Sequence, residues 1–361
     1  MKIAIIGGGN VGTLMAVEFA AKGHEVSVLT ANPSVWSKDI EAYDADDRLV
    51  YEGRLACVTD DLAEAISGAQ MIWVTYPTFM LEKLAAELLP VLKPEQWLGV
   101  VPGNDAEFVF GAHVEKGGTL FCLQRVHSVA RLKERGKSVY MLGRRTSGLH
   151  AAAIPASHTH EIAQMVRDLF DLPVEELPNY LVATLTPSNP ILHTTRIRTM
   201  FKDWKPGVTF DHNILFYEEW DIPSSELLIA CDTELQEVCR ALEEKLGLDL
   251  SGVKSLKVHY ESPDAPSMTA KISGIPGFRG LTSPMKETDH GSGKWIPDFE
   301  SRYFKADFSY GLKAIRDIAA LTGVATPCID DVYRWYRETS GDTAEFTAVP
   351  KTIEGLAALY M

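Results

Sequence analysis

The sequence predicts an α/β N-terminal domain built on a doubly wound parallel sheet, followed by an all-α C-terminal domain. Three observations support this prediction: a glycine-rich turn after the first strand, alternating strands and helices up to about residue 180, and helical patterns with little strand signal beyond it. A chain of 361 residues is long for a single hydrophobic core, so two domains are expected. We predict them at residues 1–182 and 183–361.

The glycine-rich turn is the most informative local pattern. The apolar residues 3–6 lead into Gly7, Gly9 and Gly12 at G-x-G-x-x-G spacing, and a helical pattern follows. In such a turn the first glycine allows the tight bend, the second lets the backbone approach a pyrophosphate, and the third lets the helix pack on the strand. The helix N-terminus offers free N–H groups to phosphates. Between a strand and a helix, this pattern predicts a Rossmann-type dinucleotide-binding domain, and a glycine turn that binds nothing is the alternative.

The remaining elements alternate in the first half and are helical in the second. Strands are predicted at residues 25–29, 70–75, 98–101, 119–123 and 138–142, and helices at 62–66, 80–92 and 161–170. Strands separated by helices of this length typically form a parallel sheet. Further helices are predicted at residues 189–200, 224–245, 310–321 and 330–339. Residues 260–295, rich in Gly, Pro and Ser, are predicted to form a long functional loop.

The cofactor is predicted to be NADP(H) or NAD(H), with NADP(H) favoured. NAD-specific folds place an Asp or Glu about 20 residues beyond the glycines, but no acid appears here before Asp39. Polar and basic side chains at this point are suited to a 2′-phosphate, and Ser34 is one of them. The residues predicted to bind the cofactor are Gly7, Gly9, Asn10, Val11, Gly12, Thr30, Asn32, Lys38 and Pro77.

The composition of the chain argues against several classes of binding partner. The chain carries 49 acidic against 35 basic residues, a formal charge of −14, which argues against nucleic acid and anionic membranes. No apolar run reaches 18 residues, and the N-terminus enters a strand directly, so neither a membrane span nor a signal peptide is predicted. The five scattered cysteines suggest neither a metal site nor a disulfide framework. We expect a cytoplasmic enzyme that acts on small-molecule substrates. The sequence leaves the oligomeric state open, and a homodimer is one alternative.

Two groups of residues in the second half are candidates for chemistry. Asn189 and His193 occur as Asn-Pro-x-x-His at the domain junction, and a histidine titrates near neutrality, as general acid/base work requires. Arg302 and Asp307 form the second group: an arginine matches a carboxylate, and an aspartate beside a histidine fixes its tautomer. A structural histidine and a surface ion pair are the alternatives.

Together these motifs resemble the opine dehydrogenase family, which includes octopine and nopaline dehydrogenases. The resemblance extends from the glycine turn through Asn-Pro-x-x-His, Phe-Tyr-Glu-Glu at residues 216–219 and Arg-Tyr-x-x-x-Asp at 302–307, to Gly-Val-x-Thr-Pro at 323–327. It implies that His193 and Asp307 form the catalytic pair. It also implies that Arg302, Asn189 and Tyr217 contact the substrate.

The reaction implied by this resemblance joins an amino acid to a 2-oxo acid through an imine that the cofactor reduces. Lys271, Arg279, Lys286 and Lys294 in the predicted loop are candidates for a second carboxylate anchor. Two rivals stay open. One is a single-substrate dehydrogenase of the ketopantoate or 3-hydroxy acid type, which would use a lysine such as Lys202 or Lys271, and the other is a dinucleotide sensor without turnover.

Overall fold

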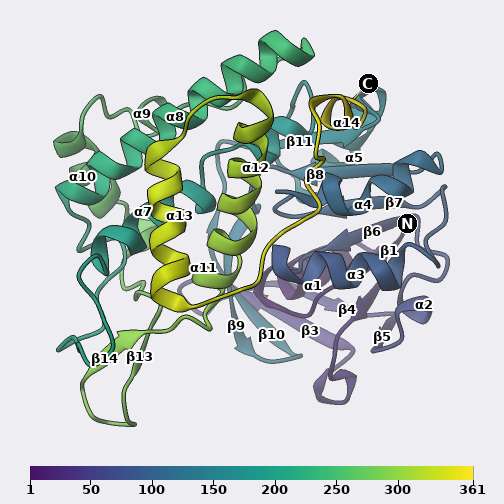
Figure 1. The fold of residues 1–361 in the computed structure, drawn as a ribbon. Coiled ribbons are helices and arrows are strands. Elements are labelled where there is room, and N and C mark those ends of the chain that lie inside the picture. Colours follow the sequence, from purple (N-terminus) through teal and green to yellow (C-terminus); the bar gives the residue numbers. More distant parts are fainter. Residues whose placement is uncertain (361) are drawn as a thin grey trace. The chain divides into compact units, whose positions relative to one another are not determined.

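The computed structural model describes residues 1–360, which form two compact units. The first comprises Met1–Thr184 together with the chain from Leu356 onward, and the second comprises Leu185–Gly355. The chain therefore passes between the units twice. Figure 1 labels most elements of both units. Within the described residues, no helix is both long and apolar enough to cross a bilayer.

An eight-stranded sheet forms the centre of the first unit, in the order β12-β11-β8-β7-β6-β1-β2-β5. Its strands are β1 (Lys2–Ile6), β2 (Glu25–Leu29), β5 (Cys57–Thr59), β6 (Met71–Val74), β7 (Trp97–Val100), β8 (Thr119–Leu123), β11 (Leu149–Ile154) and β12 (Val174–Glu176). All neighbouring strands are parallel except β8 and β11, which are antiparallel. The predicted doubly wound sheet is confirmed, with one antiparallel pair near its edge.

Short helices connect these strands. The helices of this unit are α1 (Asn10–Ala21), η1 (Pro33–Val35), α2 (Leu62–Ala65), η2 (Thr78–Met80), α3 (Leu81–Leu88), α4 (Ala106–Glu115), η3 (Ala156–His158), α5 (Thr159–Phe170) and α6 (Leu181–Thr184). Helix α14 (Ile353–Ala357) begins in the second unit and ends in the first. The core is aromatic at its centre. The indole of Trp73 contacts Phe121 at 4.7 Å and Phe170 at 6.0 Å between ring centroids, and all three side chains are buried.

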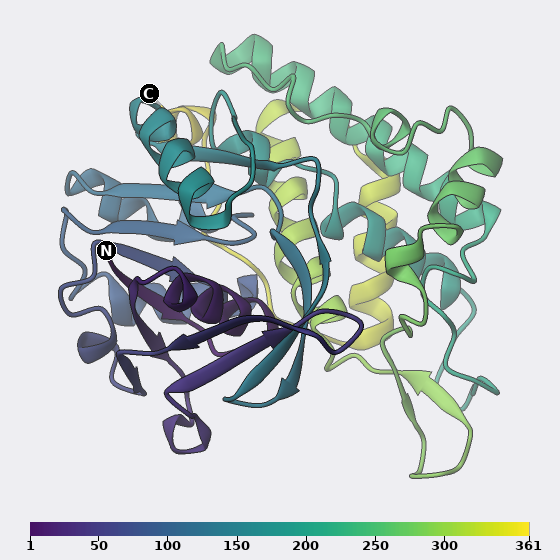
Figure 2. The ribbon, with the colours of Figure 1, turned by 180° about the vertical axis from the view of Figure 1, so that it is seen from behind.

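A second sheet of four strands lies in the same unit, in the order β4-β3-β10-β9. Its strands are β3 (Asp39–Tyr43), β4 (Leu49–Arg54), β9 (Ser128–Glu134) and β10 (Ser138–Arg144). Figure 2 shows purple β3 and β4 beside the teal hairpin of β9 and β10. The prediction that residues 138–142 continue the main sheet is wrong, because β10 pairs antiparallel with β9 and parallel with β3.

The second unit is mainly helical, as predicted. Its helices are α7 (Asn189–Met200), α8 (Ile222–Leu246), α9 (Leu256–His259), α10 (Ala265–Ser273), η4 (Pro276–Phe278), α11 (Arg302–Lys305), η5 (Asp307–Leu312), α12 (Lys313–Thr322) and α13 (Pro327–Ser340). The long α8 begins where the Asp221 carboxylate accepts the Ser224 N–H and ends at Gly247, whose φ of 67° suits a helix C-terminus. Its apolar face, which includes Leu228, Leu235 and Leu242, is buried.

The predicted loop at residues 260–295 contains more regular structure than expected. Helix α10 begins at a capping box formed by Asp264 and Ser267, a helix-start signal that the Gly, Pro and Ser content of the segment obscured. After η4, the strand β13 (Met285–Glu287) pairs antiparallel with β14 (Trp295–Pro297). This small hairpin is an addition to a domain predicted to be all-α.

Candidate active site

A histidine and an aspartate form the centre of the candidate site in the second unit. The His193 Nδ1 and the Asp307 Oδ2 are 2.8 Å apart, and both side chains are buried, with exposed fractions of 6% and 9% for the two residues. A carboxylate only accepts hydrogen bonds, so in this pair Nδ1 carries the hydrogen and Nε2 is left for proton exchange. The structure thus brings together the two residues predicted to form the catalytic pair.

The local sequence explains how these residues meet. Helix α7 begins at Asn189 with Pro190 in its first turn, where the missing N–H of a proline costs no hydrogen bond. His193 lies one turn further along the same helix. Asp307 opens η5, a stretch of π-helix between α11 and α12; such wide turns occur frequently at functional sites.

Aromatic side chains enclose the imidazole of His193. The Tyr303 ring lies 4.6 Å away and the Phe216 ring 5.4 Å away, measured between centroids. The Tyr217 hydroxyl is 3.0 Å from His193 Nε2. Burial, the largest cause, raises the pKa of Tyr217 well above that of an exposed phenol, so its hydroxyl stays protonated. The Tyr217 hydroxyl therefore lies within hydrogen-bond distance of His193, the predicted acid/base.

The two other residues predicted to contact substrate lie near the starts of their helices. Arg302 is exposed at the first position of α11, with its guanidinium 5.4 Å from the Tyr303 ring centroid. Among residues 1–360 no carboxylate forms an ion pair with it, so its charge is available to an anion. Asn189, the first residue of α7, is also exposed.

The lysines named for a rival dehydrogenase are not buried. Lys271 forms an exposed ion pair with Glu261 at 3.1 Å, and Lys202 is exposed just beyond α7. Of the cations proposed as a second carboxylate anchor, Lys286 pairs with Asp298 at 3.5 Å and Lys294 with Asp211 at 2.5 Å. Arg279 is the remaining one. It follows Phe278, whose ring stacks on Tyr217 with centroids 4.0 Å apart.

The glycine turn of the first unit has the shape that a pyrophosphate requires. Gly7 has a φ of 120°, and a Cβ at Gly12 would lie 1.8 Å from the Gly7 carbonyl oxygen, so both positions exclude side chains. A Cβ at Gly9 would meet no atom within 4 Å. This open space lies at the N-terminus of α1, where Asn10 and Val11 begin the helix with free backbone N–H groups. The turn therefore fits a dinucleotide phosphate.

The other residues predicted to bind the cofactor follow the strands that flank β1. Thr30 and Asn32 come directly after β2, and the Asn32 Oδ1 accepts the Ser34 hydroxyl at 2.8 Å. The exposed Lys38 ammonium donates to the Ala56 carbonyl at 3.2 Å. Pro77 follows β6. Parallel strands end at the same sheet edge, and β1 is the point where the strand order reverses, where a ligand crevice is expected. Thr30, Asn32 and Pro77 follow strands at this edge, whereas Lys38 precedes β3 of the other sheet.

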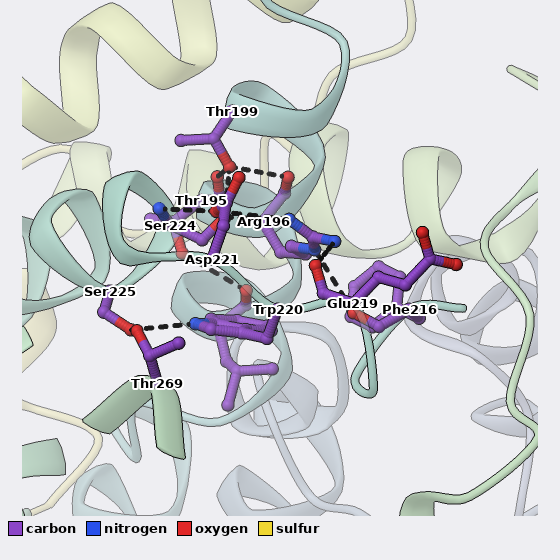
Figure 3. A network of polar contacts seen from close by, with 11 residues as sticks. Thr195, Arg196, Thr199, Phe216, Glu219, Trp220, Asp221, Ser224, Ser225 and Thr269 are labelled. Carbon is purple, nitrogen blue, oxygen red and sulfur yellow. Dashed lines mark hydrogen bonds and ion pairs between the residues drawn. The ribbon is translucent and has the colours of Figure 1, made fainter. Parts of the chain in front are cut away.

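Arg196 is an important residue that sequence reasoning missed. It lies on α7, three positions after His193, and its buried guanidinium donates from Nε to the Phe216 carbonyl at 3.2 Å and from Nη2 to the Glu219 carbonyl at 2.6 Å. Figure 3 shows this network. These hydrogen bonds hold the turn at residues 216–219, which contains Tyr217, against helix α7, which contains His193. Arg196 also pairs with the Asp221 carboxylate at 3.3 Å, but the two bonds that hold the turn go to backbone carbonyls, which leave no mark in the sequence. An arginine within a buried helical face is itself a signal.

Comparisons with known proteins cover both units. Residues 176–340 match the family described as NAD/NADP octopine/nopaline dehydrogenase, alpha-helical domain, and residues 2–101 match the NAD-dependent glycerol-3-phosphate dehydrogenase N-terminus. Tauropine dehydrogenase from Arabella iricolor is 28% identical over 369 residues, which cover 94% of this chain and 91% of that protein. Opine dehydrogenase from Haliotis discus hannai is 27% identical over 306 residues, which cover 81% and 74% respectively.

A solved structure agrees with these matches at the level of the fold. Octopine dehydrogenase with NADH and L-arginine superposes with a TM-score of 0.82 at 23% identity, covering 100% of this chain and 96% of that one. The resemblance carried by the sequence motifs is thereby confirmed. Residues 176–340 belong to the octopine/nopaline dehydrogenase family, and most of the chain is similar to tauropine and opine dehydrogenases; the protein is an NAD(P)-dependent oxidoreductase.

Proposed function

We propose that this protein catalyses the NAD(P)H-dependent reductive condensation of an amino acid with a 2-oxo acid. The observation that supports it best is the buried His193–Asp307 pair, 2.8 Å apart, together with the unpaired Arg302, which lies 5.4 Å from the Tyr303 ring that packs on His193. This pair is a proton donor and acceptor held next to a cation that suits a carboxylate. Family membership supports the reaction class, which is oxidoreduction at a CH–NH bond.

Each residue has a defined task in this proposal. Arg302 binds the carboxylate of the oxo acid, and Asn189 hydrogen-bonds the substrate or the nicotinamide amide. His193 takes a proton from the ammonium of the amino acid, so that the amine can attack the carbonyl, and returns a proton as water leaves. Asp307 holds the imidazole in one tautomer and stabilises its charged form. The cofactor, when bound, supplies the hydride that reduces the C=N bond.

Arg279 is proposed as the second carboxylate anchor. An imine formed from these substrates carries two carboxylates, and Arg279 follows Phe278, which stacks on Tyr217. Lys271, Lys286 and Lys294 already pair with carboxylates of the chain, whereas Arg279 forms no ion pair among residues 1–360. We expect Arg302→Ala and Arg279→Ala each to raise KM, for the oxo acid and the amino acid respectively.

NADP(H) is proposed as the preferred cofactor. The carboxyl end of β2 carries Thr30 and Asn32 and no acid, while Lys38 places a positive charge before β3. An acid at this point would hydrogen-bond the ribose hydroxyls of NAD(H), whereas amides and a cation suit a 2′-phosphate. A kinetic preference for NADH at equal cofactor concentrations would contradict this assignment.

Initial rates of cofactor oxidation test the proposed reaction. The enzyme is assayed with a panel of 2-oxo acids, each with and without amino acids, and rates should fall to background when either substrate is omitted. His193→Asn should lose about 10²–10⁴-fold in turnover, while cofactor binding, followed by fluorescence titration, stays unchanged. Efficient reduction of an oxo acid without amine would instead favour the single-substrate dehydrogenase.

A further inference from the structure

Both ring nitrogens of His193 are engaged by the protein itself. Nδ1 bonds the Asp307 carboxylate at 2.8 Å, and Nε2 bonds the Tyr217 hydroxyl at 3.0 Å. An imidazole has only these two positions for a proton. In this arrangement, a substrate atom that exchanges a proton with His193 does so through the atom already bonded to Nε2, which is the Tyr217 oxygen.

The Tyr217 hydroxyl is chemically able to pass a proton on. When the imidazole is neutral, Nε2 accepts the phenolic hydrogen. When it is charged, Nε2–H donates to the phenolic oxygen, and the hydroxyl hydrogen is released to point at a second acceptor. One hydroxyl thus donates in both states of His193, inward in the first and outward in the second.

The tyrosine is held in place on several sides. Its ring stacks on Phe278 with centroids 4.0 Å apart and lies nearly parallel to Trp220, at 6.4 Å and 7°. The indole N–H of Trp220 donates to Ser225 Oγ at 2.9 Å, and Ser225 bonds Thr269 at 2.7 Å. Figure 3 shows Trp220, Ser225 and Thr269 below the Arg196 network. Such packing restricts the ring, as a group that acts over one hydrogen bond requires.

The Arg196 network fixes the backbone on both sides of this tyrosine. The guanidinium bonds the carbonyls of Phe216 and Glu219, donates from Nη1 to Ser224 Oγ at 3.1 Å, and lies 5.6 Å from the Trp220 ring centroid. Because Arg196 and His193 share helix α7, the distance between Tyr217 and His193 is set by one rigid element. Arg196 is therefore a positioning residue for this contact.

The charges around the hydroxyl suit proton transfer to an anionic substrate. Besides His193, which bonds the hydroxyl, four titratable groups act on Tyr217. Tyr303, Tyr260 and Asp307 favour the neutral phenol, and Arg302 favours the phenolate. Burial keeps the phenol neutral, so the two proton movements must be concerted rather than pass through a standing phenolate. A carboxylate bound by Arg302 brings its neighbouring carbonyl carbon to the same region.

We propose that Tyr217 is a catalytic proton relay between His193 and the substrate oxygen, a role that rests on the proposed reductive condensation. As the C–O bond of the carbinolamine breaks, the Tyr217 O–H proton moves to the departing oxygen, which leaves as water. The His193 Nε2 proton moves to the Tyr217 oxygen in the same step. The substrate gains one proton, the imidazolium loses one, and the tyrosine ends unchanged with the C=N bond formed.

The first test does not depend on turnover. The imidazole ¹⁵N resonances of His193, assigned by their loss in His193→Asn, are compared between the wild type and Tyr217→Phe. Loss of the phenolic hydrogen bond should shift the Nε2 resonance of His193. Unchanged resonances would show that the hydroxyl is not bonded to His193 and would overturn the relay.

The second test uses the active enzyme. Tyr217→Phe should lower kcat by about 10²-fold, the lower range for a positioned acid/base, with a much smaller change in KM for the oxo acid. In mixed H₂O/D₂O, the dependence of kcat on deuterium fraction should be curved for the wild type, because two protons move, and linear for Tyr217→Phe. Tyr333→Phe, which removes another buried hydroxyl of the same unit, bonded to Glu345 at 3.3 Å, is the matched control.

The outcomes separate the relay from the reaction on which it rests. A wild type that reduces an oxo acid without any amine overturns the proposed condensation, while the resonance comparison still decides the His193–Tyr217 contact. A wild type that needs both substrates, with a Tyr217→Phe variant within threefold of its kcat, overturns the relay alone. A raised KM with unchanged kcat would show substrate binding instead.

Discussion

Gly311 and Pro190 are in such close contact that no side chain fits between them. A Cβ at Gly311 would lie 2.6 Å from the Pro190 Cγ and 3.1 Å from its Cβ. Pro190 lies in the first turn of α7, which carries His193, and Gly311 lies in η5, which carries Asp307. The contact between these two residues therefore sets how closely the elements that carry His193 and Asp307 approach each other.

Gly311→Ala is expected to separate this pair. The added methyl group meets a proline ring, which has little freedom to move, and overpacking of this kind costs about 1–3 kcal/mol of stability. A displacement of about 1 Å at a catalytic group can cost about 10²-fold in rate. Activity should fall well beyond what the measured loss of folded protein explains. Gly143→Ala is the control, because its Cβ meets only Val129 at 3.9 Å; equal activity of the two variants would contradict this role of the contact.

Two glycines of the N-terminal turn should behave in opposite ways. Gly9→Ala adds a methyl group in open space and has an ordinary extended backbone, so its melting temperature should match the wild type while cofactor affinity falls by at least tenfold. Gly12→Ala places its methyl group 1.8 Å from the Gly7 carbonyl oxygen, so this substitution should destabilise the first unit itself. Thermal unfolding and fluorescence titration measure the two effects. A Gly9→Ala protein with normal cofactor affinity would show that the phosphates bind elsewhere.

An acid placed after β2 should change the cofactor preference. Asn32→Asp puts a carboxylate where NAD-specific folds carry one, and it removes an amide donor. The ratio of kcat/KM for NADPH to that for NADH should fall by about tenfold or more, since a like charge repels the 2′-phosphate. Asn32→Ser, which keeps the residue neutral, is the comparison. An unchanged ratio in Asn32→Asp would place this residue outside the adenosine site.

The buried carboxyl of Glu107 should make stability depend on pH. Burial raises its pKa to about 7, while hydrogen bonds from Thr184 and Tyr360, the latter at 2.9 Å, lower it. Because the pKa is higher in the folded state than in the unfolded state, the folded protein binds the proton more tightly. The free energy of unfolding should therefore fall as pH rises from about 4.5 to 7, by roughly 3 kcal/mol, and then level off.

Denaturant unfolding across this pH range measures the effect. Glu107→Gln should flatten the slope, and Tyr360→Phe should move it to higher pH, because it removes a donor to the charged form. The neighbouring Asp105, whose pKa burial also raises, adds a change of the same sign. A Glu107→Gln protein with the full wild-type slope would contradict the assignment.

The sequence predicted elements best where local signals and burial agree. Helix α7 has the predicted bounds, and α8 differs by two residues at its start, where the Asp221 cap precedes Pro223. The four-stranded sheet was missed except for residues 138–142, because β4 has no buried residue and therefore no apolar alternation to detect. Pairing between β3 and β10 also joins segments about a hundred residues apart, which no local pattern encodes.

The candidate site could be predicted in its residue types but not in its connections. His193 and Asp307 were expected to pair, and they do. The bond from Tyr217 to Nε2 depends on the turn at residues 216–219, which Arg196 holds through backbone carbonyls that any sequence supplies. Likewise, the role of Gly311 follows from a contact across 121 residues, visible only once α7 and η5 are packed.

The mass of the product formed with cofactor deuterated at the transferred position distinguishes reductive condensation from the reduction of a single substrate. The enzyme is incubated with one amino acid and one 2-oxo acid, and the products are identified by mass spectrometry. Reductive condensation gives a secondary amine whose mass is that of both substrates less one water, plus one deuterium from the cofactor and one proton. The deuterium lies on the carbon that came from the oxo acid, and His193→Asn should form this product at least about 10²-fold more slowly. A deuterated 2-hydroxy acid, formed equally well without the amine, would contradict the proposed condensation.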